Sequence, residues 1–501
     1  MTRARRGFVP VAAAMAGAAA LCACVGPDFH RPAAPQVERY TAETLPETTA
    51  SAEGIGGAAQ HFLAERQIPR NWWTLFGSEE LDELVKEALR ANPNILSAQA
   101  ALRQAMELAA AQRGSYFPTV QASLDAQRQQ NAVGVLAPTL SSGTALFNLY
   151  TPQVTVSYVP DIFGANRRQV ESLEAQAEAS RFELDATYLT LTDNVVTAAI
   201  TEAGLRAQIA ATQRVIALER ESLALLHRQL ELGAVAEADV YAQDAALAQL
   251  EGTLPPLSKQ LHQTRDSLAV LTGRLPSEEK PVTFELAQLT LPTDLPLGVP
   301  SQLIERRPDV RAAEAQLHAA TAEVGLAIAN MLPQVVITGD AGSAATLMSD
   351  LLKPGTRFWS IGADATQTLF EGGTLLHKKR AADAAVKQAA AAYRSTVLTA
   401  FQNVADALHA LDSDAEALKA ASRAEAAAQK SLGVAHHQLE LGAVSYPALL
   451  SSELAYQQAL ASSSQARANR FADTAALFQA LGGSISAEGQ DEASSAGTIH
   501  H

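Results

Sequence analysis

The chain has 501 residues, a formal net charge of −15, two cysteines, 48% apolar residues and only 5% aromatic residues. Ordinary glycine and proline contents and a low charged share of 18% exclude a collagen-like or disordered chain. The acidic balance argues against nucleic-acid binding, which needs clustered lysine and arginine, and two cysteines cannot form a disulfide framework. The apolar residues are mostly Ala, Leu and Val, which favours closely packed helices.

The N-terminus has the layout of a secretory signal. Arginines at positions 3, 5 and 6 precede a run of small apolar residues from 7 to 20. A basic region followed by an apolar region is typical of a signal peptide, and the run is shorter than the roughly 20 residues of a membrane-spanning helix. We predict that residues 1–23 are removed, which would leave a net charge of −18 from 35 Lys and Arg against 53 Asp and Glu.

The apolar run ends in LCAC at residues 21–24, which resembles the lipobox of bacterial lipoproteins. A leucine three places before Cys24 and an alanine directly before it predict that Cys24 becomes the lipid-carrying first residue of the mature chain. Cys22 fits less well, because Ala19 stands three places before it. An ordinary secreted protein with an unmodified thiol is the alternative. Val25 follows the predicted lipidation site. By resemblance to other bacterial lipoproteins, this residue predicts that the chain is sent to the outer membrane.

Two halves of the chain are copies of one unit. The string QLELGAV occurs at residues 229–235 and again at 438–444, which is an offset of 209, and other residues repeat in the same or a nearby register. A tandem duplication leaves this pattern, and internal repeats decide the fold. We predict a lipid-anchored segment 24–78, repeat 1 at 79–275, a proline-rich linker 276–300, repeat 2 at 301–483 and a flexible tail 484–501.

Each repeat begins with a predicted helix, at residues 79–116 and 301–332, that ends at a proline. Alternating stretches follow at 119–127 and 153–159, and in the second copy at 334–341 and 359–368; with their flanks they form the strand pairs 119–160 and 334–370. A period of two predicts strands with one apolar and one polar face. Asp125 and Asp364 lie on the polar face, where we expect water. The segments between the strands are rich in turn-forming residues and are predicted to be hairpin loops.

A very long proline-free segment comes next in each repeat, at residues 164–232 and 374–441. Nearly seventy helical residues would span roughly 100 Å, and apolar residues at intervals of seven predict supercoiled packing. Gly233 and Gly442 are placed where a glycine ends a helix. A returning helix then completes each hairpin, which covers 164–273 in the first repeat and 374–482 in the second.

Four amphipathic strands cannot close a membrane barrel, because the smallest known barrels use eight strands and open edges are not tolerated in lipid. Several copies of the chain must therefore contribute strands to one barrel. A soluble periplasmic helical protein with two hairpins is the alternative. Together, the predicted signal peptide, lipid anchor and strands indicate the outer membrane of a Gram-negative bacterium.

Several strings resemble the TolC-like outer-membrane lipoproteins of tripartite efflux systems, in the NodT subgroup: WWTLFGSEELDELVKEALRANPNI, SYVPDIFG, ERRPDVRAAEAQL, MLPQVVITG, TLFEGG and CVGPDFHRP. The resemblance implies an α+β membrane protein that forms a homotrimer, with a 12-stranded β-barrel continuous with a long α-helical periplasmic barrel. It also implies that the turns at Gly233 and Gly442 form the periplasmic tip, where a membrane-fusion adaptor and an RND-type inner-membrane pump dock. Residues 25–70 would wrap around the helices.

TolC-like channels usually close this tip with acidic residues in an LLDA-like string, and here the corresponding residues 449–452 read LLSS. Ser451 therefore replaces the usual aspartate. The remaining candidates for the constriction are Asp239, Tyr446 and Glu453. We expect a less acidic gate than usual.

No Walker-type loop, GxSxG string or Cys/His set at metal spacing is found in the sequence. We therefore expect no enzyme activity and no cofactor other than the lipid on Cys24, and we expect passive conduction driven by a partner. His227, His436 and His437 near the turns are interpreted as solvated side chains rather than a pH sensor. The alternatives are a lipidated periplasmic adaptor, which has one hairpin between β-rich halves, and a structural coiled-coil lipoprotein, which lacks strand pairs.

Overall fold

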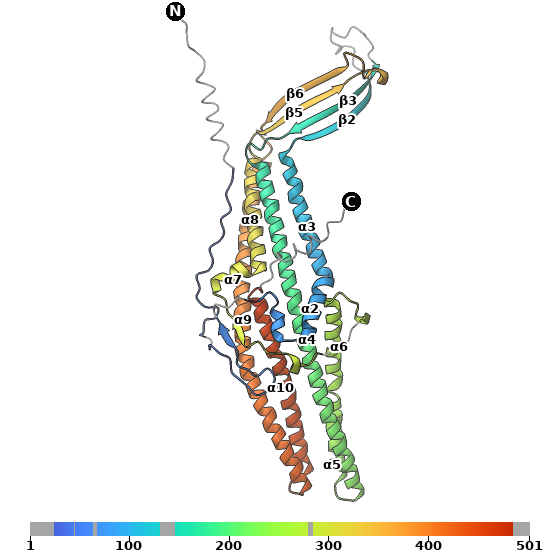
Figure 1. Cartoon of the computed structure of the whole chain (residues 1–501), viewed down its shortest axis with the longest axis vertical. Coiled ribbons are helices and arrows are strands. Elements are labelled where there is room, and N and C mark those ends of the chain that lie inside the picture. Colours follow the sequence, from blue (N-terminus) through green and yellow to red (C-terminus); the bar gives the residue numbers. More distant parts are fainter. Residues whose placement is uncertain (1–24, 45, 64–67, 131–145, 279–283, 484–501) are drawn as a thin grey trace, which may run out of the picture. The chain divides into compact units, whose positions relative to one another are not determined.

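The computed structural model describes residues 25–483 except 45, 64–67, 131–145 and 279–283 (Figure 1). The predicted lipidation site Cys24 and the predicted tail lie outside the described residues. The chain forms two compact units. Unit 1 comprises Met1–Arg31, Arg103–Ala179 and Glu314–Ala392, and unit 2 comprises Pro32–Leu102, Ser180–Ala313 and Tyr393–His501. Each unit therefore combines segments from both halves of the sequence.

Unit 1 contains an antiparallel four-stranded sheet (Figure 1). Its strands are β2 (Thr119–Gln130), β3 (Leu146–Tyr158), β5 (Gln334–Ser343) and β6 (Arg357–Thr366), in the order β2-β3-β5-β6. The four strands that the alternating pattern predicts are present. Strand β3 begins seven residues earlier than predicted, and the loop between β5 and β6 contains the short helix η6 (Met348–Asp350).

The pairing register gives this sheet one apolar and one polar face. One row across the strands is Ala122, Val154, Ala341 and Trp359, and the next row is Gln121, Thr155, Asp340 and Ser360. Successive side chains of a strand point to opposite faces, so the two rows lie on opposite faces. On the polar face, Asp340 accepts hydrogen bonds from Thr155 (2.6 Å) and Ser360 (3.1 Å). On the apolar face, Trp359 is 76% exposed.

Two very long helices follow the strand pairs. They are α4 (Ala165–Glu231) and α9 (Thr374–Glu440), each of 67 residues, so both predicted ends agree within one residue. Asp161 caps the start of α4, because its carboxylate accepts hydrogen bonds from the backbone N–H groups of Asn166 and Arg167, both at 2.9 Å. The first proline after α4 is Pro255, and the first after α9 is Pro447, so neither helix meets a residue that removes a backbone donor.

The shorter helices are more broken than the sequence analysis predicts. Residues 79–116 form α2 (Glu79–Ala91), α3 (Pro93–Arg113) and the 3-10 helix η2 (Gly114–Tyr116), and the second repeat has α7 (Pro300–Arg306) before α8 (Pro308–Ala329). The prediction of one unbroken helix is wrong in both places because Pro93 and Pro308 each start a new helix. At the first break, the side chain of Asn92 accepts a hydrogen bond from the N–H of Asn94 (2.8 Å) and donates one to the carbonyl of Leu271 (2.9 Å).

The returning helices differ between the two hairpins. In the first, the return consists of α5 (Glu237–Glu251) and α6 (Leu254–Leu271), and in the second it is the single helix α10 (Tyr446–Ala480). Pro255 and Pro256 occupy the first turn of α6, where prolines are tolerated. The prediction of a single returning helix in the first hairpin is therefore wrong, because Gly252 and Thr253 separate α5 from α6.

The predicted linker 276–300 is partly ordered into short elements. It contains η4 (Pro276–Glu278), η5 (Leu286–Gln288) and β4 (Asp294–Pro296), and β4 pairs in parallel with β1 (His61–Leu63) of the N-terminal segment. The sequence analysis predicts no strand there. Three-residue strands carry too little alternation to be recognised from their sequence.

The main core of unit 2 is rich in aromatic residues although the whole chain is poor in them. Trp72 and Phe76 belong to the 3-10 helix η1 (Trp72–Phe76), and both are fully buried. Trp72 stacks on Phe478 with ring centroids 5.3 Å apart, and Phe76 lies 6.3 Å from Phe471. These contacts attach the N-terminal segment to α10, and burial of rings of this size dominates the local stability.

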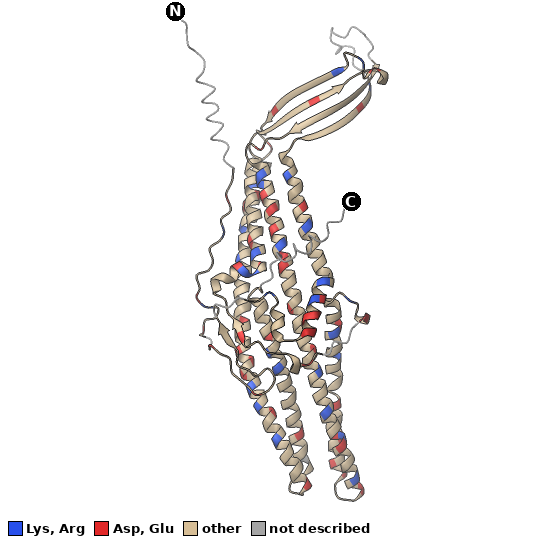
Figure 2. Cartoon of the chain, viewed as in Figure 1, with Lys and Arg blue, Asp and Glu red and all other residues tan. Residues whose placement is uncertain are grey.

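Charged residues are spread along the helices, and the sheet carries few of them (Figure 2). Among the described residues, none of the helices has both the length and the apolarity that are needed to span a membrane.

Candidate functional site

The two hairpin turns have the same geometry and lie at the same end of unit 2 (Figure 1). Gly233 and Gly442 both have a φ of +68°. The N–H of Ala234 donates to the carbonyl of Gln229, and the N–H of Ala443 donates to that of Gln438, both at 2.8 Å. This is a Schellman motif. A Cβ on either glycine would meet nothing within 4 Å, so φ rather than space requires glycine there.

The polar gate candidates next to the turns occupy two different environments. Asp239 accepts a hydrogen bond from the backbone N–H of Ala236 at 3.3 Å and so caps the start of α5. Ser451 is exposed on α10. Tyr446 and Glu453, in contrast, are only 8% and 4% exposed in the single chain. Asp239 and Ser451 are therefore available to solvent or a partner, whereas Tyr446 and Glu453 face the inside of the helix packing.

Glu453 is part of a buried polar group that joins the two hairpins. Glu219 of α4 is 3% exposed and Gln243 of α5 is fully buried, and the Gln243 side-chain amide donates a hydrogen bond to the Glu219 carboxylate. Burial, and then the neighbouring Glu219 carboxylate, raise the pKa of Glu453 to about 8. Burial, followed by the Glu453 and Glu219 charges, raises the pKa of Tyr446 above its ordinary value.

Heptad spacing could have identified this buried group. Tyr446, Leu449, Glu453, Tyr456 and Leu460 of α10 are spaced three and four residues apart, which is the spacing of positions that face a partner helix. Glu453 takes one of these inward positions. The burial of Glu453 follows from this heptad and not from its place among the acidic residues after the turn.

The histidines near the turns are exposed, as predicted: His227, His436 and His437 all lie on the surface. His436 Nε2 is 3.8 Å from Glu453 Oε1, which is an ion-pair contact only when the imidazole is protonated. Among the described residues, no group of three or more His, Cys, Asp or Glu side chains is arranged to hold a metal ion.

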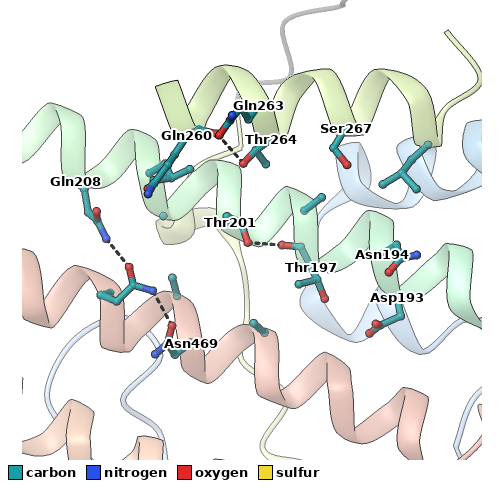
Figure 3. Close-up of a pocket in the computed structure, with 17 residues that line it drawn as sticks. Asp193, Asn194, Thr197, Thr201, Gln208, Gln260, Gln263, Thr264, Ser267 and Asn469 are labelled. Carbon is teal, nitrogen blue, oxygen red and sulfur yellow. Dashed lines mark hydrogen bonds between the residues drawn. The ribbon is translucent and has the colours of Figure 1, made fainter. Parts of the chain in front are cut away.

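A polar groove with a volume of about 760 Å³ lies between α4, α6 and α10 in unit 2 (Figure 3). Amide and hydroxyl side chains supply most of its polar lining, as Figure 3 shows for Gln208, Gln260, Thr264, Ser267 and Asn469. Gln208 donates to Gln465 across the groove at 3.0 Å, and Gln465 donates to Asn469 at 2.7 Å. Neither lysine nor arginine lines it. Apart from Asp193, the groove therefore offers uncharged hydrogen-bonding groups.

Asp193 is the one acidic residue in the lining of this groove. Its Oδ1 atom is buried and has no hydrogen-bond partner among the described residues. Burial raises the pKa of Asp193 to about 6. The groove thus carries a single carboxyl group that titrates under mildly acidic conditions.

A sequence model of the outer membrane efflux protein family matches residues 84–274 and 299–483. The chain belongs to this family. The two matched stretches lie one in each half of the chain and include both hairpin turns. The chain is therefore an outer-membrane efflux channel protein.

Individual relatives agree with the family assignment. The chain is 28% identical over 422 residues to the pyoverdine export outer membrane protein OpmQ of Pseudomonas putida, which covers 84% of this chain and 89% of OpmQ. It is 27% identical over 468 residues to the toluene efflux pump outer membrane protein TtgI of Pseudomonas putida, covering 91% and 94%. The adaptor and coiled-coil alternatives are therefore set aside.

Solved structures give the same result. The outer-membrane channel OprN superposes with a TM-score of 0.81 at 27% identity, covering 92% of this efflux protein and 99% of OprN. The Campylobacter jejuni CmeC outer membrane channel has a TM-score of 0.84 at 20% identity and covers 95% and 99%, which indicates a common fold.

The segment that follows the predicted lipidation site is held by one buried arginine of unit 1. The side chain of Arg168 is 5% exposed and forms ion pairs with Asp28 and Glu171, both at 2.8 Å. Its guanidinium also donates to the carbonyl of Val25 at 3.4 Å. Phe29 stacks on His318 with ring centroids 4.5 Å apart. The chain directly after Cys24 is thereby fixed to α4 and α8.

Proposed function

We propose that this outer-membrane efflux protein is one third of a trimeric channel, in which three four-stranded sheets form a 12-stranded barrel in the outer membrane. The long helices of three chains would form a tunnel through the periplasm. Small molecules would pass through it passively, from a periplasmic adaptor and an RND-type inner-membrane pump to the exterior.

The observation that carries this proposal is the sheet of unit 1. Its order β2-β3-β5-β6 leaves β2 and β6 as edges, and one of its faces is apolar, with Trp359 and Ile361 76% and 77% exposed. An apolar face with open edges is unstable both in water and in lipid. Edge-to-edge pairing of three sheets removes all edges and turns the apolar faces toward lipid.

The face that carries Asp125, Asp340 and Asp364 would then line the water-filled barrel. In the pairing register, all three residues lie on the same face of the sheet as Ser360. In unit 2, the groove between α4, α6 and α10 would supply a second polar surface, lined mostly by amides and hydroxyls. Amide and hydroxyl side chains suit the wall of a channel, because they hydrogen-bond to water and hold neither cations nor anions tightly.

The substrate is chosen elsewhere in such an assembly. Two relatives are named for pyoverdine export and for toluene efflux. Relatives that share this chain's length and pattern are thus named after compounds of very different chemistry. We therefore propose that the pump selects the substrate and that this chain supplies the exit.

The turns at Gly233 and Gly442 would form the periplasmic tip that meets the adaptor. Asp239 and Ser451 lie beside these turns at the surface, and they are the gate candidates that a passing solute could contact. We expect Asp239→Ala to raise single-channel conductance, because it removes a charge and a helix cap at the constriction. Glu237→Ala, at an exposed neighbouring position, is the matched control.

The lipid on Cys24 would anchor the N-terminus, and the Arg168 contacts would keep that anchor at a fixed place on the chain. One acyl-modified residue adds to membrane attachment but does not replace the barrel. We expect Cys24→Ala to lose the lipid, as measured by mass spectrometry of the N-terminal peptide, and still to require detergent for extraction.

Two measurements test the proposal. Protein extracted in detergent from the outer membrane should have a native mass of three chains, and it should conduct ions in planar bilayers. A single-chain mass together with no conductance would contradict the trimeric channel.

A further inference from the structure

Three polar side chains form one layer in the helical core of unit 2. They are Glu219 of α4, Gln243 of α5 and Glu453 of α10, which are 3%, 0% and 4% exposed. Each occupies an inward heptad position, since apolar core residues stand three or four places away along the same helix. A polar residue at such a position reduces stability, so its presence in three helices at once calls for a physical reason.

Apolar clusters lie on both sides of this polar layer. Toward the turns, Leu226, Val240, Ala435, Tyr446 and Leu449 form one cluster that includes all four helices of the two hairpins. Away from the turns, Val215, Ile216, Leu247 and Leu250 form another, with Tyr456 and Leu460 packed against it. The polar layer is therefore sealed from water on two sides, and it lies where the hairpin α4–α5 meets the hairpin α9–α10.

The hydrogen bonds of the layer are incomplete without a proton. Gln243 donates to one oxygen of Glu219, but Oε1 of Gln243 and Oε2 of Glu453 are buried without a hydrogen-bond partner. Two ionised carboxylates can only accept hydrogen bonds. A proton on Glu453 would supply the missing donor to Glu219 and would remove one of two adjacent buried charges.

Few other charged groups face this pair. From α9, His436 lies 3.8 Å from Glu453; from α5 the facing side chain is the neutral Gln243; on α10 itself, Tyr446 lies near both glutamates. Within the described residues, no lysine or arginine forms an ion pair with Glu219 or Glu453. The usual compensation for a buried carboxylate is thus absent.

We propose that Glu453 carries a proton and donates it in a hydrogen bond to Glu219, and that this pair acts as a proton-dependent latch between the two helical hairpins of the chain. With the proton bound, the pair forms a hydrogen bond across the interface and holds the hairpins together. When the proton leaves, two adjacent negative charges in a buried layer repel each other, and the hairpins separate so that water can reach them.

The direction of the pH dependence follows from linkage. Burial and then Glu219 raise the pKa of Glu453 to about 8 in the joined hairpins, whereas a solvated glutamate ionises near pH 4.5. Between these two values, separation of the hairpins releases a proton. Rising pH therefore shifts the equilibrium toward separation, by up to about tenfold per pH unit, and acidification holds the hairpins together.

The hairpin ends carry the turns that form the tip in the proposed channel. This step alone rests on the proposed function. In the proposed channel, the latch would make the tip narrow under acidic conditions and wide under alkaline conditions. The latch itself is a property of one chain and can be measured without any transport assay.

The test measures the distance between the two turns. Nitroxide labels are attached to Leu232→Cys and Leu441→Cys, two positions that are 83% and 69% exposed, in detergent-extracted full-length protein mixed with an excess of unlabelled chains. A control sample without these two substitutions shows how much label attaches to the chain's own cysteines. Pulsed electron paramagnetic resonance should give a short distance at pH 5 and a growing fraction of longer distances up to pH 9.

Three variants distinguish the latch from a general effect of pH. Glu453→Gln supplies an N–H donor to Glu219 without a proton, so we expect the short distance at every pH, and Glu219→Gln provides a second, independent version of the same test. Glu221→Gln changes an exposed glutamate of the same helix and should keep the wild-type dependence. His436→Gln should also keep it, because the latch is formed by the two carboxyl groups and His436 is an exposed neighbour.

Constant distances from pH 5 to 9 in the wild type would overturn the proposal. So would a pH dependence that survives in both Glu453→Gln and Glu219→Gln. If the distances change as expected but the protein does not conduct, the latch is supported and the proposed channel function fails; the two conclusions are thus tested separately.

Discussion

Arg470 is a charged side chain that the core of unit 2 buries completely. Its guanidinium donates to the Thr49 hydroxyl at 2.9 Å and to the Ala58 carbonyl at 2.7 Å. Burial lowers the pKa of Arg470, and the Asp414 carboxylate partly opposes this effect. A buried charge of this kind is tolerated because it satisfies backbone and hydroxyl acceptors that would otherwise be unpaired.

Replacing this arginine should therefore release the N-terminal segment. We expect Arg470→Met to destabilise the protein by about 2–4 kcal/mol, since the acceptors around residues 49–58 remain buried without a donor. The measurement is the apparent midpoint of thermal unfolding, together with limited proteolysis of this segment. Arg394→Met changes an exposed arginine of α9 and should leave both unchanged. Equal midpoints for the two variants would show that the contacts of Arg470 contribute nothing.

Asp193 in the polar groove gives a pH prediction of its own. Its pKa lies near 6 in the folded chain against an ordinary value of 3.8, so the folded state loses stability as pH rises through this window. We expect Asp193→Asn to raise the unfolding midpoint by several degrees at pH 8 and to leave it unchanged at pH 4. Asp266→Asn, on the exposed surface of α6, should have no effect at either pH. A gain that is equal at both pH values would contradict burial as its cause.

At the scale of elements, the two turns depend on backbone conformation. Because Gly442 has a φ of +68° and open space around its Cβ position, Gly442→Ala should cost about 1 kcal/mol through backbone strain alone. Hydrogen exchange of the turn amides should become roughly fivefold faster. Gly433→Ala provides a matched control in the exposed part of α9, where φ is helical, and should slow exchange because alanine favours helix. Slower exchange in both variants would mean that the turn is not under this constraint.

The elements that the sequence predicts well are those with a long, regular pattern. The four strands follow from alternation over seven or more residues, and the ends of α4 and α9 follow from a proline-free run closed by glycine. Pro93, Pro255 and Pro308 indicate breaks in the sequence, but the helical periodicity on both sides of each proline favours one continuous helix. The parallel pair β1–β4 could not be predicted, because its pairing joins His61 to Asp294 across more than two hundred residues.

The gate candidates illustrate the same limit within a single helix. Ser451 and Glu453 both follow the second turn closely, so their place in the sequence predicts similar exposure to solvent. In the structure, Ser451 is exposed and Glu453 is buried. This difference in exposure depends on which face of α10 packs against α4 and α5. In the sequence, only the heptad spacing that begins at Tyr446 and Leu449 indicates that face. Whether a buried glutamate is compensated depends on Glu219 and Gln243, which lie on other helices and cannot be assigned to it from sequence.

For the whole molecule, the proposed assembly can be tested at the edges β2 and β6 of the sheet in unit 1. If three copies close a barrel, β2 of one chain lies beside β6 of the next. A cysteine on the polar face of β2, Ser123→Cys, should then form a disulfide with one of Phe358→Cys, Ser360→Cys or Gly362→Cys on the same face of β6.

Denaturing gels after mild oxidation should show a covalent trimer for at least one of these three pairs. The matched control combines Ser123→Cys with Gln153→Cys, whose positions pair within the same sheet, so it should oxidise within one chain and run as a monomer. Only monomers from all three β2–β6 pairs, with the control fully oxidised, would mean that the sheet edges are not joined between chains. That result would contradict the proposed 12-stranded barrel, because its closure requires β2 of one chain to pair with β6 of the next.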